Sequence, residues 1–434
     1  MKVYIETLGC PKNFNDSEVA AGILEAAGDI VTKDFNEADV IMVNTCGFIN
    51  DAKVESIDRI FDFANLEDKL LVVSGCLAQR YGDDLYDEME EVDIFIGVNE
   101  YDRLPEILHN HLDGKREKII SEYKSELETD KRKLEDIHYS ATLKISEGCD
   151  NKCAYCVIPQ IRGPYRSRPM ENIIDEAKRL VANGVKEIIL IAQDVTTYGI
   201  DLYGKYNLHE LVEKLCEIED LKWLRLMYCY EDRITDELIE VMAREEKVCN
   251  YLDIPIQHSS DNVLKAMKRR STNESILSTI ERLRKAIPDI AIRTTLIVGF
   301  PGETEEDFDN LYDFVEDTKF QRLGVFSYSQ EEGTVAAEME NQIDEEVKEE
   351  RKDAIMRLQM DISRQSNEAL VGKIIDVLVE YKDEEGVYIG RSQYDAPEID
   401  NQVIIKTLTD HQPGDFIKVK IDDAYDYDIV GREI

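Results

Sequence analysis

The feature that most constrains the fold of this 434-residue chain is an alternation of short apolar runs with amphipathic stretches, which occurs twice and then stops. In the first hundred or so residues the apolar runs are rich in β-branched side chains, and the stretches between them have helical periodicity. This order is typical of βαβ units and of a parallel sheet. A Rossmann-like α/β domain is therefore predicted at the N-terminus. Its predicted strands span residues 3–8, 40–44, 70–74 and 94–97.

The second alternation contains six predicted strands, too few for a complete eight-stranded barrel, and so indicates a partial, open α/β barrel. These strands span residues 142–146, 187–192, 224–227, 252–256, 291–297 and 323–328. An amphipathic helix is predicted over 340–366. From about residue 370 the pattern changes to short alternating strands with turn residues between them, which predicts a small antiparallel β-barrel. The predicted domains are residues 1–115, 138–366 and 367–434, with a charged linker over 116–137.

The chain carries 92 acidic and 52 basic side chains, a formal net charge of −40. Such a surface repels nucleic-acid phosphate and attracts cationic proteins, although the same charge also serves solubility. No basic region followed by an apolar stretch opens the sequence, and no apolar run approaches the roughly 18 residues of a membrane span, so a cytoplasmic protein is predicted. In that reducing compartment the nine cysteines are expected to be metal ligands, catalytic thiols or core residues.

Cys149, Cys153 and Cys156 form a CxxxCxxC motif just after the first predicted strand of the open barrel. Thiolates are the ligands of iron–sulfur clusters, and three of them leave one iron of a 4Fe-4S cubane open. An open iron can chelate S-adenosylmethionine (SAM), whose reductive cleavage yields a 5′-deoxyadenosyl radical. A structural zinc site needs a fourth ligand, and the next cysteine is Cys216. A radical-SAM enzyme is therefore predicted, in preference to a zinc site or a chance cluster of core cysteines.

A second set of cysteines stands at the ends of predicted strands of the N-terminal domain. Cys10 follows the first strand, Cys46 the second and Cys76 the third. The carboxyl ends of parallel strands lie along one edge of a sheet, where ligand sites form. Three thiolates on neighbouring loops are therefore expected to bind a second cluster with an open iron. The alternative is three buried cysteines without a ligand.

Residues near the strand ends of the open barrel are candidates for binding SAM away from its cluster. Gln193 and Gln257 each follow a predicted strand and offer amide groups, although loop capping is the alternative for both. Val298 and Gly299 are predicted to offer backbone to the adenine. Tyr155, inside the cysteine motif, is predicted to pack on the cluster or the adenine, with plain core packing as the alternative.

The cysteine motif, the three scattered cysteines and the order of domains together resemble the radical-SAM methylthiotransferases over essentially the whole chain. The segments VNTC at 43–46 and IVGFPGET at 297–304 are shared with that family. Further segments are similar to the branch that modifies an aspartate of a small-subunit ribosomal protein. They are CPKN at 10–13, IPQIRG at 158–163, YRSRP at 165–169 and RSQYDAPEID at 391–400.

The resemblance implies an N-terminal methylthiotransferase domain, a radical-SAM barrel and a C-terminal TRAM barrel. It also implies two 4Fe-4S clusters, SAM as cofactor and methyl source, a basic ribosomal protein as substrate, and separate donors of electrons and sulfur. The radical would take hydrogen from the β-carbon of the aspartate, and that carbon would then receive sulfur held at the second cluster. Lys12 and Arg166 are candidates to meet the carboxylate of the substrate or of SAM, although exposed basic residues usually do neither.

The charge of the predicted C-terminal barrel favours a protein substrate over RNA. Residues 371–434 contain 15 Asp and Glu against 7 Lys and Arg, a net charge of −8. A barrel that holds RNA is expected to be basic, whereas an acidic barrel suits a protein rich in Lys and Arg. Two alternatives stay open: a tRNA adenosine methylthiotransferase with the same chemistry, and a non-catalytic iron–sulfur factor associated with the ribosome.

Overall fold

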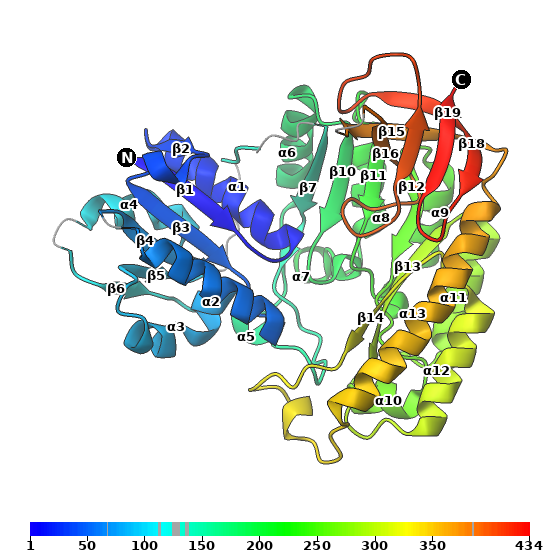
Figure 1. Ribbon diagram of the computed structural model, residues 1–434, viewed down its shortest axis with the longest axis horizontal. Coiled ribbons are helices and arrows are strands. Elements are labelled where there is room, and N and C mark those ends of the chain that lie inside the picture. The colour runs from blue at the N-terminus through cyan, green and yellow to red at the C-terminus, as the bar shows by residue number, and fades with distance from the viewer. Residues whose placement is uncertain (67, 112–113, 124–130, 135–138, 384–385) are drawn as a thin grey trace.

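The computed structural model describes the chain except residues 67, 112–113, 124–130, 135–138 and 384–385. Figure 1 shows an N-terminal α/β domain beside a larger α/β domain, whose sheet is followed by a long helix and a small barrel. None of the helices within the described residues is long and apolar enough to cross a membrane.

The N-terminal domain is built on a six-stranded parallel sheet in the order β2-β1-β3-β4-β5-β6. Alternate residues of β3 enter the two cores that cover its faces: Ile41 and Val43 one, Val40 and Met42 the other. The strands are β1 (Lys2–Thr7), β2 (Ile30–Thr32), β3 (Val40–Thr45), β4 (Leu70–Gly75), β5 (Ile94–Ile96) and β6 (Glu117–Ile119). The helices are α1 (Pro11–Ala26), α2 (Asn50–Ala64), α3 (Cys76–Glu88) and α4 (Leu104–Asn110).

The four predicted strands of this domain are present, and two further strands were not predicted. Both β2 and β6 are three residues long and partly exposed, so neither has the apolar run that marks a buried strand. The strand β6 lies inside the predicted charged linker and pairs in parallel with β5. Residues 124–130 and 135–137 of that linker lie outside the described residues.

The second domain holds the predicted six-stranded open sheet, all parallel, in the order β14-β13-β12-β11-β10-β7. Its strands are β7 (Ser140–Lys144), β10 (Glu187–Ile191), β11 (Trp223–Leu226), β12 (Val248–Asp253), β13 (Ala291–Val298) and β14 (Arg322–Ser327). One predicted strand, 252–256, begins four residues too late and runs too far. Pro255 lacks an N–H for the ladder, so β12 ends before it.

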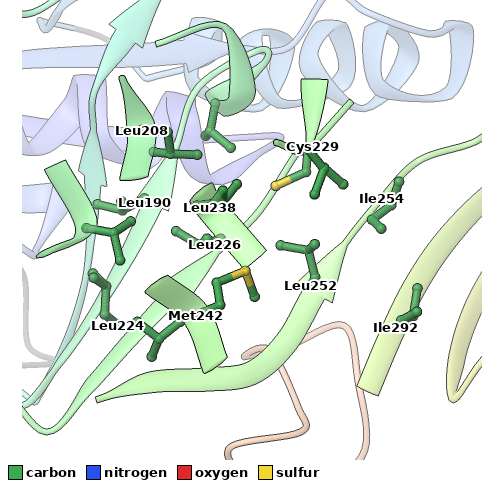
Figure 2. Packing of buried hydrophobic residues seen from close by; sticks show 14 of the residues in the cluster. Leu190, Leu208, Leu224, Leu226, Cys229, Leu238, Met242, Leu252, Ile254 and Ile292 are labelled. Carbon is green, nitrogen blue, oxygen red and sulfur yellow. The ribbon is translucent and has the colours of Figure 1, made fainter. Parts of the chain in front are cut away.

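This domain also contains helices, most of which pack on its sheet. They are α5 (Ile158–Arg162), α6 (Met170–Ala182), α7 (Ile200–Tyr203), α8 (Leu208–Cys216), α9 (Asp236–Arg244), α10 (Asp261–Ala266), α11 (Asn273–Ala286), α12 (Glu305–Thr318) and α13 (Glu345–Glu368). Figure 2 shows the leucines of β10, β11 and β12 packed with Leu238 and Met242 of α9. Cys216 and Cys229 belong to the same core, and Cys249 is buried in another, so these three cysteines are packing residues.

The C-terminal barrel is closed in the order β15-β16-β17-β19-β18. Its strands are β15 (Ile374–Lys382), β16 (Tyr388–Ser392), β17 (Val403–Lys406), β18 (Phe416–Ala424) and β19 (Ile429–Glu433). The last strand was not predicted, and it corrects the expectation of a wholly antiparallel barrel, because β19 pairs in parallel with β17. That pairing brings the end of the chain against an earlier strand and closes the barrel, which removes its sheet edges.

Candidate functional site

The three strand-end cysteines lie at the C-terminal edge of the first sheet. Cys10 precedes α1, Cys46 follows β3 and Cys76 is the first residue of α3. The backbone at Gly9 approaches Cys46 so closely that a Cβ there would lie 3.0 Å from the cysteine sulfur. The φ of +91° at Gly9 also favours glycine. The fold therefore gathers thiols that are up to 66 positions apart in the sequence.

Asn13 connects the loops that carry these cysteines, and sequence reasoning missed it. Its amide donates to the carbonyl oxygens of Leu8 at 2.9 Å and Thr45 at 3.0 Å, and its Oδ1 lies 3.6 Å from the Cys76 sulfur. Arg162 reaches the same place from α5 and donates to Asn13 Oδ1 at 2.9 Å and to the Cys76 sulfur at 3.2 Å. Because Arg162 comes from the second domain, the site is shared between domains.

The CxxxCxxC loop is closed at its base by the short antiparallel strands β8 (Ser146–Glu147) and β9 (Arg166–Ser167). The Cys149 N–H donates to the Gly163 carbonyl at 3.1 Å. Gly148 has a φ of +76°, and a Cβ on it would lie 2.1 Å from the Pro164 carbonyl oxygen. Glycine is therefore required at the point where the strand turns into the cysteine loop.

Aromatic and polar groups from the open barrel support this loop. The Tyr230 hydroxyl lies 2.8 Å from the Cys153 sulfur, and the Arg269 guanidinium lies 4.2 Å from the centre of the Tyr230 ring. Asn151 donates to the Asp194 carboxylate at 2.8 Å and anchors the middle of the loop to the end of β10. Tyr230 and Arg269 lack a sequence motif, so only the fold identifies them.

Both cysteine sets suit iron–sulfur clusters. Burial raises the pKa of Cys76 and of Cys149 to about 11 and that of Cys156 to about 12, and it also raises the pKa of Cys46. Bound iron would supply the positive charge that makes these thiols thiolates. Among the described residues no three His, Cys, Asp or Glu side chains could hold a single metal ion. A cubane binds each thiolate to a different iron, so its ligands stand further apart than those of one ion.

A buried network of charges joins the two domains between the cysteine sets. Asp16 of α1 accepts from Lys144 of β7 at 2.6 Å and from Arg162 at 2.6 Å. Glu147, beside the cysteine loop, pairs with Lys144 at 2.8 Å and accepts from Gln193 at 2.9 Å. Burial alone would raise the pKa of Glu147, but Lys144 and Arg162 outweigh burial and hold it well below its usual range. This network connects α1, which begins directly after Cys10, to β7 and to Glu147, which precedes the CxxxCxxC loop.

Of the residues predicted to contact SAM, Tyr155 lies in the CxxxCxxC loop and Gln193 lies beside Glu147, which precedes that loop. Tyr155 is partly buried, and burial and the neighbouring Cys153 raise the pKa of its hydroxyl. Gln193 Oε1 is buried without a hydrogen-bond partner among the described residues. Gln257 has a φ of +73°, and its side chain donates to the Pro255 carbonyl at 3.3 Å. These positions stay predictions for SAM binding.

The other two predicted contacts lie at the end of β13. The Val298 side chain is fully buried in the core, and its carbonyl accepts from the Tyr328 N–H at 2.9 Å. A Cβ on Gly299 would lie 2.2 Å from Lys348, so glycine allows α13 to approach there. Whether either residue offers backbone to the adenine stays a prediction.

The segment 391–400, which carries part of the family resemblance, lies in the contact between the barrel and the open sheet. Asp395 accepts from Arg322 Nε at 2.8 Å, and Asp400 accepts from the Tyr251 hydroxyl at 2.7 Å. Both carboxylates are buried in the protein. Asp395 and Asp400 are therefore two acidic side chains of the barrel that face arginines inside the protein and not a basic partner.

Comparisons with known proteins agree with this architecture. Residues 143–315 match the model of the radical SAM superfamily, residues 2–97 that of uncharacterized protein family UPF0004, and residues 371–434 that of the TRAM domain. The solved structure of the radical SAM methyltransferase TsrM from Kitasatospora setae covers 75% of this chain and 72% of its own, with a TM-score of 0.57 and 15% identity. That likeness concerns the fold. The fold and the family models thus define a radical SAM protein.

Sequence relatives specify the family within that class. The chain is 49% identical over 436 residues to the ribosomal protein uS12 methylthiotransferase RimO of Clostridioides difficile, covering 99% of this chain and 98% of the relative. It is 51% identical over 441 residues to the protein of the same description from Trichlorobacter lovleyi, covering 100% and 98%. The chain belongs to the RimO family of ribosomal protein uS12 methylthiotransferases.

Proposed function

We propose that this chain is a radical SAM methylthiotransferase that attaches a methylthio group to the β-carbon of an aspartate in ribosomal protein uS12. The family relationship over the full length supports the enzyme class and the substrate protein. The observation that carries the proposal is the pair of three-cysteine sets joined through Arg162. This arginine lies six residues after Cys156 and donates to the sulfur of Cys76 in the other set.

SAM and a 4Fe-4S cluster are the cofactors of the radical SAM class, and we assign the cluster to Cys149, Cys153 and Cys156. A second 4Fe-4S cluster on Cys10, Cys46 and Cys76 completes the proposal. When bound, these groups supply a 5′-deoxyadenosyl radical and an iron that presents sulfur. The reaction also needs a donor of electrons and a donor of sulfur as partners.

The residues of the chain contribute position more than reactivity. Asp16 of the N-terminal domain and Arg162 of the second domain form a buried ion pair, which we expect to keep the two cysteine sets at a fixed separation. Tyr230 contacts the Cys153 sulfur, and Arg269 packs on the Tyr230 ring. Radical transfer depends on holding the reacting atoms close together, and a rigid seam between domains serves that need.

Mass spectrometry of uS12 from cells with and without this protein tests the substrate. We expect uS12 to lose the mass of a methylthio group on one aspartate when the protein is absent, and bulk tRNA to be unchanged. Loss of a methylthio group from tRNA adenosine, with uS12 unaltered, would instead establish the tRNA enzyme. A purified protein that forms no 5′-deoxyadenosine from SAM under reducing conditions would be a non-catalytic factor.

Iron analysis tests the second cluster. The variant Cys10→Ala/Cys46→Ala/Cys76→Ala should hold about four irons per chain, against about eight in the reconstituted parent, because one cubane is lost. It should still cleave SAM without transferring a methylthio group. Cys216→Ala is the matched control, since its thiol packs in the core, and it should keep about eight irons. Equal iron in the parent and the triple variant would refute the two-cluster proposal.

A further inference from the structure

Lys12 lies between the two cysteine sets. It stands two positions after Cys10, in the first turn of α1, and its ammonium lies 3.3 Å from the centre of the Tyr228 ring. Tyr228 follows β11, and two residues further on Tyr230 contacts the Cys153 sulfur at 2.8 Å. The short segment from Tyr228 to Tyr230 therefore contacts both Lys12, which lies beside Cys10, and Cys153 of the CxxxCxxC loop. Figure 1 shows α1 beginning on the side of its domain that faces the open barrel.

The charge of Lys12 has no carboxylate partner among the described residues, although the chain has a net charge of −40. Its neighbours differ: Lys144 and Arg162 share the carboxylate of Asp16. Asp253 is linked to the ring that holds Lys12, because its carboxylate accepts from the Tyr228 N–H at 2.9 Å. This carboxylate is paired with Arg293 at 2.9 Å and not with Lys12. The half-buried ammonium of Lys12 is thus held on an aromatic face without a counter-charge.

Local stability does not explain a lysine at this position. Positive charge in the first turn of a helix is opposed by the helix dipole, and α1 has no acidic residue there to offset it. Tyr228, which receives the ammonium, has a φ of +62°, a conformation that a bulky residue seldom adopts. Two hydrogen bonds keep Tyr228 in this conformation. Its N–H donates to Asp253, and its carbonyl accepts from the Val195 N–H at 3.1 Å. Retained strain of this kind is typical of functional positions.

We propose that Lys12 binds the carboxylate of the substrate aspartate and so selects aspartate over its uncharged amide. This assignment rests on the proposed function. In aspartate the β-carbon is bonded directly to the carboxylate carbon, so an ammonium that grips the carboxylate also places the β-carbon between the two cysteine sets. Arg166, the other basic candidate, lies in β9 at the base of the cysteine loop, where its Nη2 donates to the Arg162 carbonyl at 3.2 Å and its guanidinium lies over the Tyr123 ring, while its Nε and Nη1 are buried without a partner among the described residues.

Binding measurements without a reductant test the assignment, because SAM is then not cleaved. The reconstituted enzyme with SAM is titrated with recombinant uS12 and with uS12 in which asparagine replaces the target aspartate. We expect the parent to bind the aspartate form about 10- to 100-fold more tightly, the range of a hydrogen bond between charged groups. Lys12→Met should lose this preference, and Lys12→Arg should keep most of it. Lys115→Met, at an exposed lysine of the same domain, is the matched control and should behave as the parent.

Two results would overturn the assignment. One is a Lys12→Met enzyme with the parent's preference for the aspartate form. The other is weaker SAM binding with that preference intact, which would assign Lys12 to the carboxylate of SAM. Iron content shows whether Lys12→Met is correctly assembled. If Lys12→Met is not correctly assembled, binding to the parent enzyme still tests the assignment, since equal binding of both uS12 forms by the parent excludes a carboxylate site. Adding a reductant then tests the proposed function separately, because a parent that binds uS12 selectively and leaves it unmodified refutes the function only.

Discussion

At the scale of single residues, Glu187 shows how strongly this fold depends on matched buried charge. Its carboxylate is fully buried and pairs with Arg391 of the barrel at 2.6 Å and with Arg225 of the open sheet at 3.0 Å. Burial alone would raise its pKa, but the two arginines outweigh burial and hold the pKa at about 2. Glu187 therefore connects the barrel to the open sheet through buried ion pairs.

Replacing this carboxylate should destabilise the chain in a pH-dependent way. We expect Glu187→Gln to lower the free energy of unfolding by about 3–5 kcal/mol at pH 7, because two buried arginines lose their partner. A folded pKa below the ordinary value stabilises the protein above about pH 4.5, and that stabilisation, about 3 kcal/mol, is lost as the pH falls towards 2. Urea unfolding of the iron-free chain at pH 7 and pH 3 measures both effects.

The exposed Glu240 on α9 provides the control for this comparison. Glu240→Gln should differ from the parent by less than about 0.5 kcal/mol at either pH. The gap in the free energy of unfolding between Glu187→Gln and the parent should narrow from pH 7 to pH 3, because at pH 3 the carboxylate takes up a proton when the parent unfolds, whereas in the folded parent its pKa is about 2. A gap that stays constant with pH would show that packing, and not charge, is what the glutamate contributes.

At the scale of elements, the loop between β8 and β9 shows how backbone shape sets a metal site. Gly148 precedes the first cysteine with a φ of +76°, and a side chain there would meet the Pro164 carbonyl. We expect Gly148→Ala to displace the loop and to leave about four irons per chain, those of the cluster on the other domain. SAM cleavage should fall with the iron. Iron analysis and 5′-deoxyadenosine formation measure the two effects.

A second glycine provides the control for a Gly→Ala substitution at a position where the backbone does not require glycine. Gly324 lies in β14 with open space around its Cα and without a positive φ. Gly324→Ala should therefore keep the parent's iron and SAM cleavage. Full iron in Gly148→Ala would mean that the loop accommodates a side chain and that its glycine is not required.

At the scale of the whole molecule, the net charge of −40 is the property most open to test. Part of it is internal, because Asp395 and Asp400 face arginines inside the protein, but other acids lie outside, such as Asp410 with a side chain 91% exposed. Such a surface should attract a basic ribosomal protein over distances that salt shortens. The association rate with uS12 should fall about tenfold or more between low and high salt.

Stopped-flow binding at rising salt measures this dependence, and an uncharged osmolyte at equal concentration is the control. The osmolyte should leave the association rate nearly unchanged, because it does not screen charge. An association rate that ignores salt would assign the acidity to solubility and not to the partner.

The sequence by itself predicted the order of two α/β domains and a barrel, located the six strands of the open sheet, and singled out both sets of cysteines as candidate ligands. Strongly buried strands have apolar runs that are visible without a fold, and thiols at strand ends share an edge in any parallel sheet. The short strands β2 and β6 escaped prediction because half-exposed three-residue segments have no such signal. The strand β19 was not predicted because its pairing with β17 depends on closure of the barrel.

Only the tertiary structure decided which polar residues act together. Asn13 and Arg162 meet at Cys76 although 149 positions separate them, and no local pattern announces that contact. The segment 391–400 identified a family in the sequence, yet in the structure its carboxylates join the barrel to the sheet. In the sequence Lys12 is one of 52 basic residues, and its place over the Tyr228 ring is visible only in the structure. Periodicity along the chain reports burial, whereas the partners of a buried charge are set by packing between distant segments.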